Sequence, residues 1–161
     1  MTWFCKNILP LIRSQLPQIR LFIVGQSPAK AVQELASPAV TVTGAVEDVR
    51  PYLEKAAVYV VPMRMGGGVR LKVLEAMASG IPVVSTRAGA EGIAVEDEEN
   101  ALLAETAAEF AAKVVEVLTN VSLGRQMASQ GRKLVEDQYD WRSITPKLEE
   151  LYARLKAKCA A

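Results

Sequence analysis

Short apolar segments alternate with segments of helical periodicity along this chain, and this alternation constrains the fold more than any other feature. The apolar segments cover residues 20–25, 40–44, 58–62 and 81–85, with a weaker one at 100–104. Most of them are apolar throughout, which is typical of parallel strands buried on both faces. We therefore predict an α/β fold, a doubly wound parallel sheet with helices on both faces.

The helices expected from the spacing of apolar residues cover 3–16, 28–36, 48–56, 69–79, 107–119, 122–138 and 143–158. Asp48 is expected to cap the third of these helices, and Gly80 to end the fourth. The aromatic residues at helix edges are expected in the core rather than in ligand stacking; they are Trp3, Phe4, Tyr139 and Trp141.

Length and composition describe a single domain over residues 1–161 and exclude several classes of protein. Lys and Arg number 19 against 18 Asp and Glu, so bulk positive charge does not drive nucleic-acid binding. Half of the residues are hydrophobic, which excludes intrinsic disorder, yet no apolar run has the length of a membrane span. The two cysteines, Cys5 and Cys159, lie near opposite ends and make no disulfide framework, which indicates a reducing cytoplasm.

The chain has no histidine. This absence removes Ser-His-Asp and Cys-His catalysis and histidine-ligated metal sites, and two distant cysteines make no zinc site. We therefore expect no metal. Any chemistry depends on carboxylates, Lys, Arg, backbone amides or a bound ligand.

The most informative segment is Gly66-Gly-Gly-Val-Arg-Leu-Lys-Val-Leu-Glu75, which joins a predicted strand to a predicted helix. Gly66, Gly67 and Gly68 allow close approach of the backbone to a ligand, and the first amides of a helix bind anions. The segment matches neither the Walker A pattern nor the dinucleotide fingerprint. Spacing alone leaves a diphosphate site and a plain turn about equally supported.

Lys72 and Glu75 fall on one stripe of this helix, together with Gly68 at its start. The layout suits a nucleotide, with phosphates at the helix end, Lys72 assisting them and Glu75 accepting hydrogen bonds from sugar hydroxyls. A solvated ion pair of little energetic weight is the alternative interpretation.

Residues 62–86 resemble the donor-binding signature of the family-four retaining glycosyltransferases. The flanking segments 21–25, 42–46, 89–93, 100–103 and 139–141 also occur where a member of that family has them. The resemblance implies the two-lobed GT-B architecture, of which this chain is similar to the C-terminal, Rossmann-like lobe that binds a nucleotide-sugar. The N-terminal lobe, which binds the acceptor, is absent from these residues. The last helix would pack toward that lobe, so its apolar stripe is expected to be partly exposed; the stripe consists of Ile144, Leu148, Leu151 and Leu155.

The resemblance also assigns roles to residues. Glu75 matches the glutamate that contacts the donor ribose, whereas the glutamate that contacts the transferred sugar falls on Gly67. Backbone amides and Lys72 are expected to share that second task, and Val69 and Arg70 are placed in the donor site with the glycines. Val46 matches the place where the base is held. Glu91 lies in a loop that borders the sugar in relatives, although a surface turn explains it equally well.

The helix over 3–16 corresponds to the helix that follows the first strand of such a lobe, so that strand is expected before residue 1. Without it, two facing strand edges are left unpaired. We expect either that these two strands close up or that another chain or segment fills the gap, which includes self-association through the edges.

The function favoured is that of a glycosyltransferase donor-binding domain, which binds a UDP- or GDP-sugar for retaining transfer to a glycan or lipid-linked acceptor in bacterial polysaccharide biosynthesis. No cofactor is expected. The location expected is cytoplasmic, with the full-length enzyme peripheral to the inner membrane face. The chain alone is expected to bind nucleotide weakly and to transfer little. The alternatives are a nucleotide-binding or regulatory module without its own catalysis, and a non-hydrolysing epimerase, a class that normally needs acidic and His groups that this chain lacks.

Overall fold

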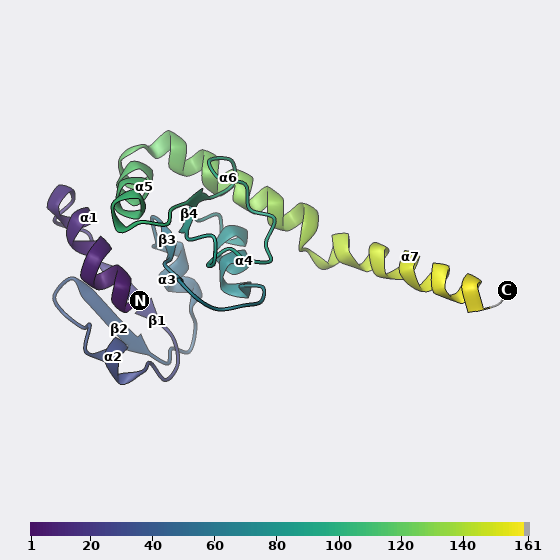
Figure 1. Cartoon of the computed structure of the whole chain (residues 1–161), viewed down its shortest axis with the longest axis horizontal. Helices are drawn as coiled ribbons and strands as arrows, with labels where there is room; N and C mark the ends of the chain where they lie inside the picture. The colour runs from purple at the N-terminus through teal and green to yellow at the C-terminus, as the bar shows by residue number, and fades with distance from the viewer. Residues whose placement is uncertain (160–161) are drawn as a thin grey trace.

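A computed structural model describes residues 1–159 and confirms an α/β fold with parallel strands (Figure 1). β1 (Leu21–Val24) pairs in parallel with β2 (Val40–Gly44). β3 (Tyr59–Val61), β4 (Val83–Ser85) and β5 (Leu102–Leu103) form a second parallel sheet in that order. All five strands lie within the predicted apolar segments, because each consists mainly of β-branched, aliphatic or aromatic residues.

The strands do not form one sheet, because β1 and β3 share no hydrogen-bonded ladder. The expectation that these two strands close up is therefore wrong. The packing that unites the two sheets runs through the first helix, whose Phe4 and Ile8 belong to the same buried cluster as Val40 of β2 and Val84 of β4. A helix that is already packed across both sheets sets their separation without any pairing of the strands.

The first helix begins as a π-helix, η1 (Phe4–Ile8), and continues as α1 (Leu9–Gln15). The N–H of Leu9 donates to the carbonyl of Phe4, five residues earlier. Pro10 explains this local widening, since it has no N–H and its ring clashes with the carbonyl of Lys6 in a regular α-helix. The predicted helix over 3–16 is therefore confirmed, with an irregular first part.

Several helices are shorter than predicted. α2 covers Lys30–Gln33 and α3 covers Arg50–Glu54. The prediction that Asp48 is the N-cap is wrong in position, since Val49 precedes the first helical residue; Asp48 Oδ1 still accepts a hydrogen bond of 2.9 Å from the N–H of Arg50. α4 covers Leu71–Ala78 and begins later than expected, because Arg70 keeps a non-helical backbone. Gly80, with φ of 70°, ends it as predicted.

Helices cover the two faces of the β3–β4–β5 sheet. α5 (Ala107–Thr119) and the η1–α1 helix bury Val84 and Leu102 on one face, where Phe110 of α5 is fully buried. α4 and α6 (Val121–Gln138) cover the other face, where Val83 belongs to a second cluster with Met77 and Leu134. The alternation of neighbouring residues between two cores confirms that this sheet is buried on both sides.

α7 (Trp141–Cys159) projects away from the body of the molecule (Figure 1). The expectation that its apolar stripe is partly exposed is confirmed, since Leu148, Leu151 and Leu155 are exposed. The prediction that Trp141 belongs to the core is wrong: its side chain is 75% exposed, because the helix leaves the body at this residue. Within residues 1–159, no helix is both long enough and apolar enough to cross a bilayer.

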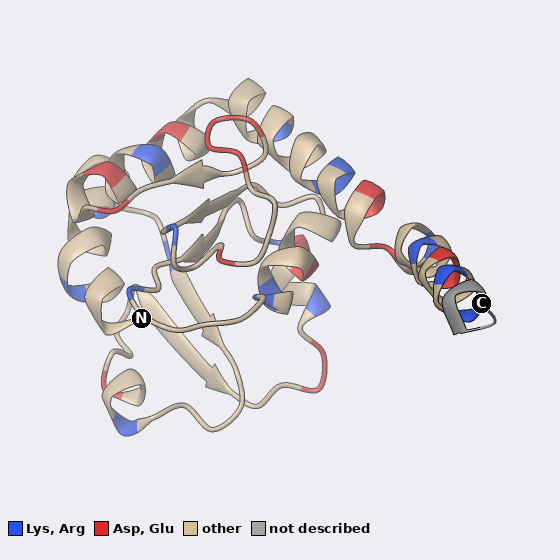
Figure 2. Ribbon diagram, turned by 45° about the vertical axis from the view of Figure 1, so that its right-hand side comes forward, with Lys and Arg blue, Asp and Glu red and all other residues tan. Residues whose placement is uncertain are grey.

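Charged side chains are spread over the helices, as a net charge of +1 suggests (Figure 2). Lys and Arg do not gather over one element in this view, whereas one loop between β4 and β5 is strongly acidic, with Glu96, Asp97, Glu98 and Glu99.

Candidate functional site

A glycine-rich loop joins the carboxyl end of β3 to α4, where ligands bind in open parallel sheets. Gly66 and Gly68 have φ of 138° and 86°, which an L side chain rarely adopts. Gly67 has no such left-handed φ, and a β-carbon there would meet nothing within 4 Å. Two of the three glycines are therefore required by the backbone itself, and the middle one is not.

The N–H groups of this loop are unused. From Gly66 to Lys72, no backbone N–H donates a hydrogen bond to another residue that the structure describes. The first N–H groups bonded within α4 are those of Val73 and Leu74, which donate to the carbonyl of Arg70. The first turn has no acidic residue and Arg70 provides no side-chain cap. A row of free donors at a helix N-terminus is a site for an anion.

Arg70 adds positive charge beneath this row. Its Nε and Nη2 are buried and have no hydrogen-bond partner among the described residues. A β-carbon on Gly66 would overlap Nη2 of Arg70, so the guanidinium packs directly under the loop. Arg70 as a whole is half-buried, and burying N–H donors without a partner is costly. An anion held by the loop would compensate it. The prediction places Arg70 in the donor site, and the structure places its side chain beside the glycines.

Lys72 and Glu75 form an ion pair, with 2.9 Å between Nζ and Oε2. Their side chains are 69% and 47% exposed, so the pair is solvated. Hydrogen bonding to Glu75 raises the pKa of Lys72. Burial raises the pKa of Tyr59 on β3, whose phenol lies near both charges. The prediction that Lys72 and Glu75 share one face of the helix is thus confirmed. In this structure the two side chains bind each other.

A pocket of about 420 Å³ lies beside the loop. Its lining combines β3 and the residues that follow it, 59–63, with the start of α4, residues 69–73, and Met1. The pocket thus brings together Val69, Arg70 and Lys72 from the predicted set. The other predicted site residues lie outside its lining; they are Val46, Gly66, Gly67, Gly68, Glu75 and Glu91.

The loop after β4 supports the glycine loop from the side. A β-carbon on Gly92 would lie 2.9 Å from Cγ2 of Val69, and Gly92 itself has φ of 78°. Glu91, exposed and next to Gly92, is therefore carried close to the glycine loop. Val46 follows β2 in the other sheet and is half-buried; no hydrogen bond or ion pair described here joins it to the glycine loop.

Thr86 holds these two loops together, a role that the sequence did not reveal. Its buried hydroxyl donates to the carbonyl of Met63 and accepts a 3.0 Å hydrogen bond from the N–H of Gly89. A β-carbon on Gly89 would lie 2.7 Å from the carbonyl oxygen of Val61, so the turn presses against the end of β3. The only sequence signal for this anchor is a hydroxyl at the end of an apolar strand.

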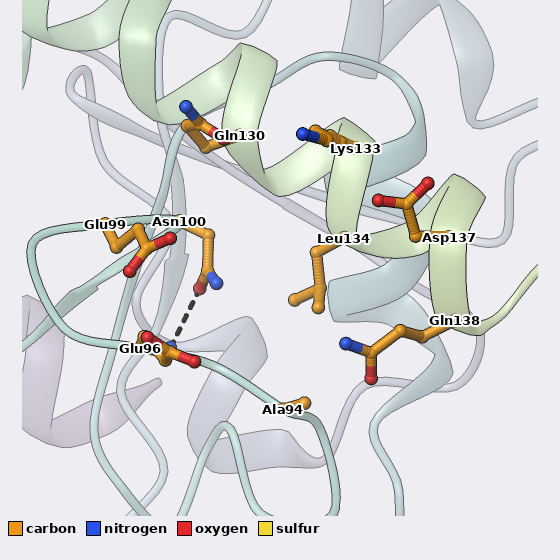
Figure 3. Close-up of a pocket in the computed structure, with 9 residues that line it drawn as sticks. All are labelled: Ala94, Glu96, Glu99, Asn100, Gln130, Lys133, Leu134, Asp137 and Gln138. Atoms are coloured by element: carbon orange, nitrogen blue, oxygen red, sulfur yellow. Dashed lines mark hydrogen bonds between the residues drawn. The ribbon is translucent and has the colours of Figure 1, made fainter.

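A second hollow, of about 220 Å³, lies between the acidic loop and α6 (Figure 3). Glu96 and Glu99 approach each other there, and the Glu96 carboxyl raises the pKa of Glu99. Asn100 Oδ1 accepts a 3.0 Å hydrogen bond from the N–H of Glu96, which shapes the loop. In the described part of the chain, no three acidic or thiol side chains are grouped so that they could hold a metal ion.

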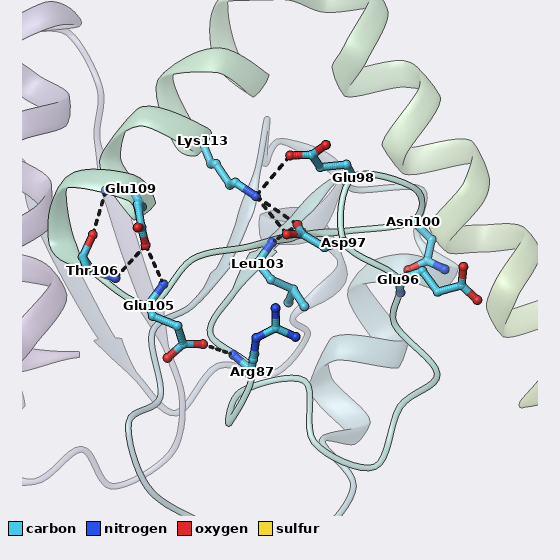
Figure 4. A network of polar contacts seen from close by, with 10 residues as sticks. All are labelled: Arg87, Glu96, Asp97, Glu98, Asn100, Leu103, Glu105, Thr106, Glu109 and Lys113. Atoms are coloured by element: carbon cyan, nitrogen blue, oxygen red, sulfur yellow. Dashed lines mark hydrogen bonds and ion pairs between the residues drawn. The ribbon is translucent and has the colours of Figure 1, made fainter.

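The rest of the acidic loop is part of a structural network (Figure 4). Lys113 of α5 lies 3.0 Å from Asp97 and 3.8 Å from Glu98. Asp97 also accepts a 2.7 Å hydrogen bond from the N–H of Leu103 in β5. These contacts fix the loop to α5 and β5, so we assign it to the fold and not to ligand binding.

Comparison with known proteins decides the family. Residues 1–120 match the family of glycosyl transferases, group 1. The chain belongs to the group 1 glycosyltransferases. A curated member from Mycobacterium tuberculosis, a GDP-mannose-dependent alpha-(1-6)-phosphatidylinositol monomannoside mannosyltransferase, is 28% identical over 158 residues, which cover 88% of this chain and 41% of that protein. The chain spans about two fifths of the length of several curated relatives that it matches.

Several solved structures have the same fold. The C-terminal domain of the family protein LpcC from Francisella tularensis matches with a TM-score of 0.75 and 22% identity, covering 87% of this chain and 79% of that one. Anabaena Alr3699/HepE, solved in complex with UDP and glucose, matches with a TM-score of 0.73 and 18% identity, covering 92% of this chain and 45% of that one. The prediction of a Rossmann-like C-terminal lobe of the GT-B architecture is confirmed.

Proposed function

We propose that this chain is the donor-binding lobe of a retaining glycosyltransferase and that the loop from Gly66 to Lys72 holds the diphosphate of a nucleotide-sugar. The observation that carries the proposal is the row of N–H groups without a partner among the described residues, which lies over the buried Nε and Nη2 of the half-buried Arg70. Membership of the family and the presence of UDP in a structural relative support it.

Lys72 and Glu75 then act on different parts of the donor. Lys72 leaves Glu75 and turns to the diphosphate, because a phosphate bears more charge than one carboxylate. Glu75, once released, accepts hydrogen bonds from the ribose hydroxyls. The N–H groups, Arg70 and Lys72 stabilise the negative charge that develops on the departing diphosphate. Gly67 provides no carboxylate for the transferred sugar, so backbone groups near Gly67 and the loop of Glu91 contact it.

The nucleotide is UDP or GDP in this proposal. One relative is named for its dependence on GDP-mannose and another was solved with UDP. Val46, after β2, is assigned to the base. The acceptor, a glycan or a lipid-linked sugar, binds to a second lobe outside these residues. In this proposal the full-length enzyme is bacterial and acts in polysaccharide synthesis. It is cytoplasmic and peripheral to the membrane.

Titration calorimetry of the chain with UDP, GDP and their sugars tests this function. Lys72→Met is expected to weaken UDP or GDP binding about tenfold or more, since charge-assisted hydrogen bonds contribute about 1.5–3 kcal/mol. Glu75→Gln is expected to weaken binding of both the nucleotide and the nucleoside without phosphates, because Glu75 contacts the ribose. Lys72→Met is expected to leave the affinity for the nucleoside unchanged, because Lys72 contacts only the diphosphate.

The ion pair between Lys30, in α2, and Glu34, which follows α2, provides a control, since it is also exposed, at 89% and 65%, and lies away from the glycine loop (Figure 1). Lys30→Met and Glu34→Gln are expected to leave nucleotide affinity unchanged. A folded chain that binds no nucleotide, or an equal loss in the control variants, contradicts the proposed function.

A further inference from the structure

The hollow between the acidic loop and α6 (Figure 3) is a part of the molecule that the donor-site proposal does not use. It shares no lining residue with the pocket beside the glycine loop. Residues from 94 to 100 form one wall. α6 forms the other wall with side chains at positions i, i+3, i+4, i+7 and i+8, which share one helix face; they are Gln130, Lys133, Leu134, Asp137 and Gln138. Leu134 is buried and provides an apolar floor, whereas the other four residues are polar and exposed.

Asn100 directs an unused donor into this hollow. Asn100 is only 7% exposed, and its Oδ1 accepts a 3.0 Å hydrogen bond from the N–H of Glu96. Because a backbone N–H can only donate, this bond fixes the orientation of the amide and leaves both N–H groups of Nδ2 for other partners. Nδ2 points toward the hollow in Figure 3 and donates to no other residue that the structure describes. A buried donor without a partner is costly, so a ligand that brings an acceptor to Nδ2 is stabilised there.

The α6 wall also has polar groups without partners. The ion pair between Arg132 and Glu136 on this helix includes no residue of the hollow. No hydrogen bond or ion pair joins the side chains of Lys133, Asp137 or Gln138 to another described residue. The Gln138 amide points back toward the acidic loop (Figure 3). Donors and acceptors therefore face each other across the hollow.

Two carboxyl groups on the loop wall limit what the hollow can bind. Glu96 raises the pKa of Glu99 through a hydrogen bond between the carboxyls and through charge repulsion, so a ligand that donates hydrogen bonds to both is favoured. The assignment of the acidic loop to the fold concerns Asp97 and Glu98, whose carboxylates turn to α5 instead. A simple cation would satisfy Glu96 and Glu99 but would leave Nδ2 of Asn100 without an acceptor. A hydroxyl group both donates and accepts, which suits all of these groups.

We propose that this hollow binds one neutral sugar ring of a glycan, at a site separate from the glycine loop. The hydroxyl groups of the sugar donate to the carboxylates of the two walls and accept from the amides of Asn100 and Gln138. The C–H face of the ring packs on Leu134. The volume of about 220 Å³ is below the roughly 300–1,000 Å³ of pockets that enclose drug-sized ligands, so it suits one ring and not a nucleotide. The inference goes beyond the proposed function and does not depend on nucleotide binding.

An NMR titration of the chain with methyl glycosides tests the site. The probes are the methyl α-D-pyranosides of glucose, mannose and galactose, added up to about 50 mM, because a small open site binds with a dissociation constant on the order of millimolar. At least one probe is expected to shift the side-chain amide signals of Asn100 and Gln138 and the backbone signals of residues 94–100. The signals of residues 66–72 are expected to stay unchanged, and added UDP is expected to leave the affinity for the sugar unchanged.

Two variants remove donors from the hollow. Asn100→Asp keeps the oxygen that accepts from the N–H of Glu96 and replaces the free Nδ2, so the affinity for the sugar should fall about three- to tenfold, as expected for one hydrogen bond. Gln138→Leu should weaken binding by a similar factor, and because Gln138 is exposed this variant folds even if Asn100→Asp does not. Gln126→Leu is the matched control, since Gln126 is exposed on the same helix and lies outside the lining. It should leave the affinity unchanged.

Three results overturn the proposal. In the first, none of the three glycosides shifts the signals of the hollow in the folded chain. In the second, Gln126→Leu weakens binding as much as Gln138→Leu, so the contact with the sugar is not specific to the hollow. In the third, methylguanidinium shifts these signals and the sugars do not, so the hollow takes a basic group. Failure of UDP binding contradicts the donor-site proposal and leaves this one unaffected.

Discussion

A β-carbon on Gly92 would lie 2.9 Å from Cγ2 of Val69, so the turn after β4 is in contact with the residue that follows the three loop glycines. This contact and the hydrogen bonds of Thr86 hold the glycine loop against the turn after β4. The glycine loop has few internal restraints, because its N–H groups donate to no residue within 1–159. Its shape therefore depends on the neighbouring turn.

Gly92→Ala should destabilise the fold and disturb the loop. The substitution forces an L residue into a left-handed backbone and pushes its β-carbon against Val69. We expect a loss of about 1–3 kcal/mol in the free energy of unfolding, measured by urea denaturation. Gly25→Ala is the control, since its β-carbon would meet nothing within 4 Å and its φ is not left-handed. Equal stability of the two variants would show that the turn does not press on the loop.

Gly66→Ala and Gly67→Ala separate two glycines that are adjacent in sequence. At Gly66 the new β-carbon overlaps Arg70 Nη2 and the backbone is strained, so stability and nucleotide affinity should both fall. At Gly67 the new β-carbon projects into open space, so the free energy of unfolding should change by less than about 1 kcal/mol. Thermal denaturation with and without UDP distinguishes them. A larger loss of stability at Gly67 would mean that the loop has another conformation.

The fold was predictable to the extent that it depends on local sequence. Runs of aliphatic residues located each strand, and Gly80 located the end of α4 because a left-handed residue there requires glycine. The resemblance predicted two facing strand edges, but it did not predict that they stay apart, because this depends on how Phe4 and Ile8 pack over both halves.

The geometry of the candidate site was predictable in part: the glycine-rich loop before α4 and the shared helix face of Lys72 and Glu75 were expected from their spacing. The role of these residues in donor binding stays a prediction. The exposure of Trp141 and the anchoring role of Thr86 were not predictable, since both depend on contacts between segments distant in sequence. The burial of Nε and Nη2 of Arg70 was also beyond prediction, because helical spacing does not reveal a side chain folded back under its own loop.

Asp97 should contribute to the loss of stability in acid. Partial burial alone would raise its pKa, but the N–H of Leu103 and the ammonium of Lys113 outweigh burial and lower it. A carboxyl with a lowered pKa in the folded state stabilises the fold above its unfolded pKa of about 3.9. This stabilisation disappears as the pH falls through the folded value. Asp97→Asn should therefore show a shallower decline in unfolding free energy below about pH 4 than the parent chain.

Glu149→Gln on the exposed face of α7 is the control for this pH profile, since it has no hydrogen bond or ion pair with another described residue. It should reproduce the parent profile. A profile for Asp97→Asn that coincides with the parent at every pH would mean that the contacts with Leu103 and Lys113 do not form in solution.

Two aromatic substitutions should differ sharply in their effect on the free energy of unfolding. Phe110 is fully buried and makes edge-to-face contacts with Trp3 and Phe4, so Phe110→Ala should cost about 3–5 kcal/mol. Trp141→Ala, at the exposed start of α7, should change the free energy of unfolding by less than about 0.5 kcal/mol. Chemical denaturation followed by circular dichroism gives both values. A large cost at Trp141 would place that ring in the core after all.

The projection of α7 has a hydrodynamic consequence. A compact chain of 161 residues has a radius of gyration of about 15 Å. A helix over Trp141–Cys159 is itself about 28 Å long and lies outside the body (Figure 1). The mass at its far end enters the radius of gyration with the square of its distance from the centre. Small-angle scattering should therefore give a radius of gyration above the value for a compact chain, and an elongated profile.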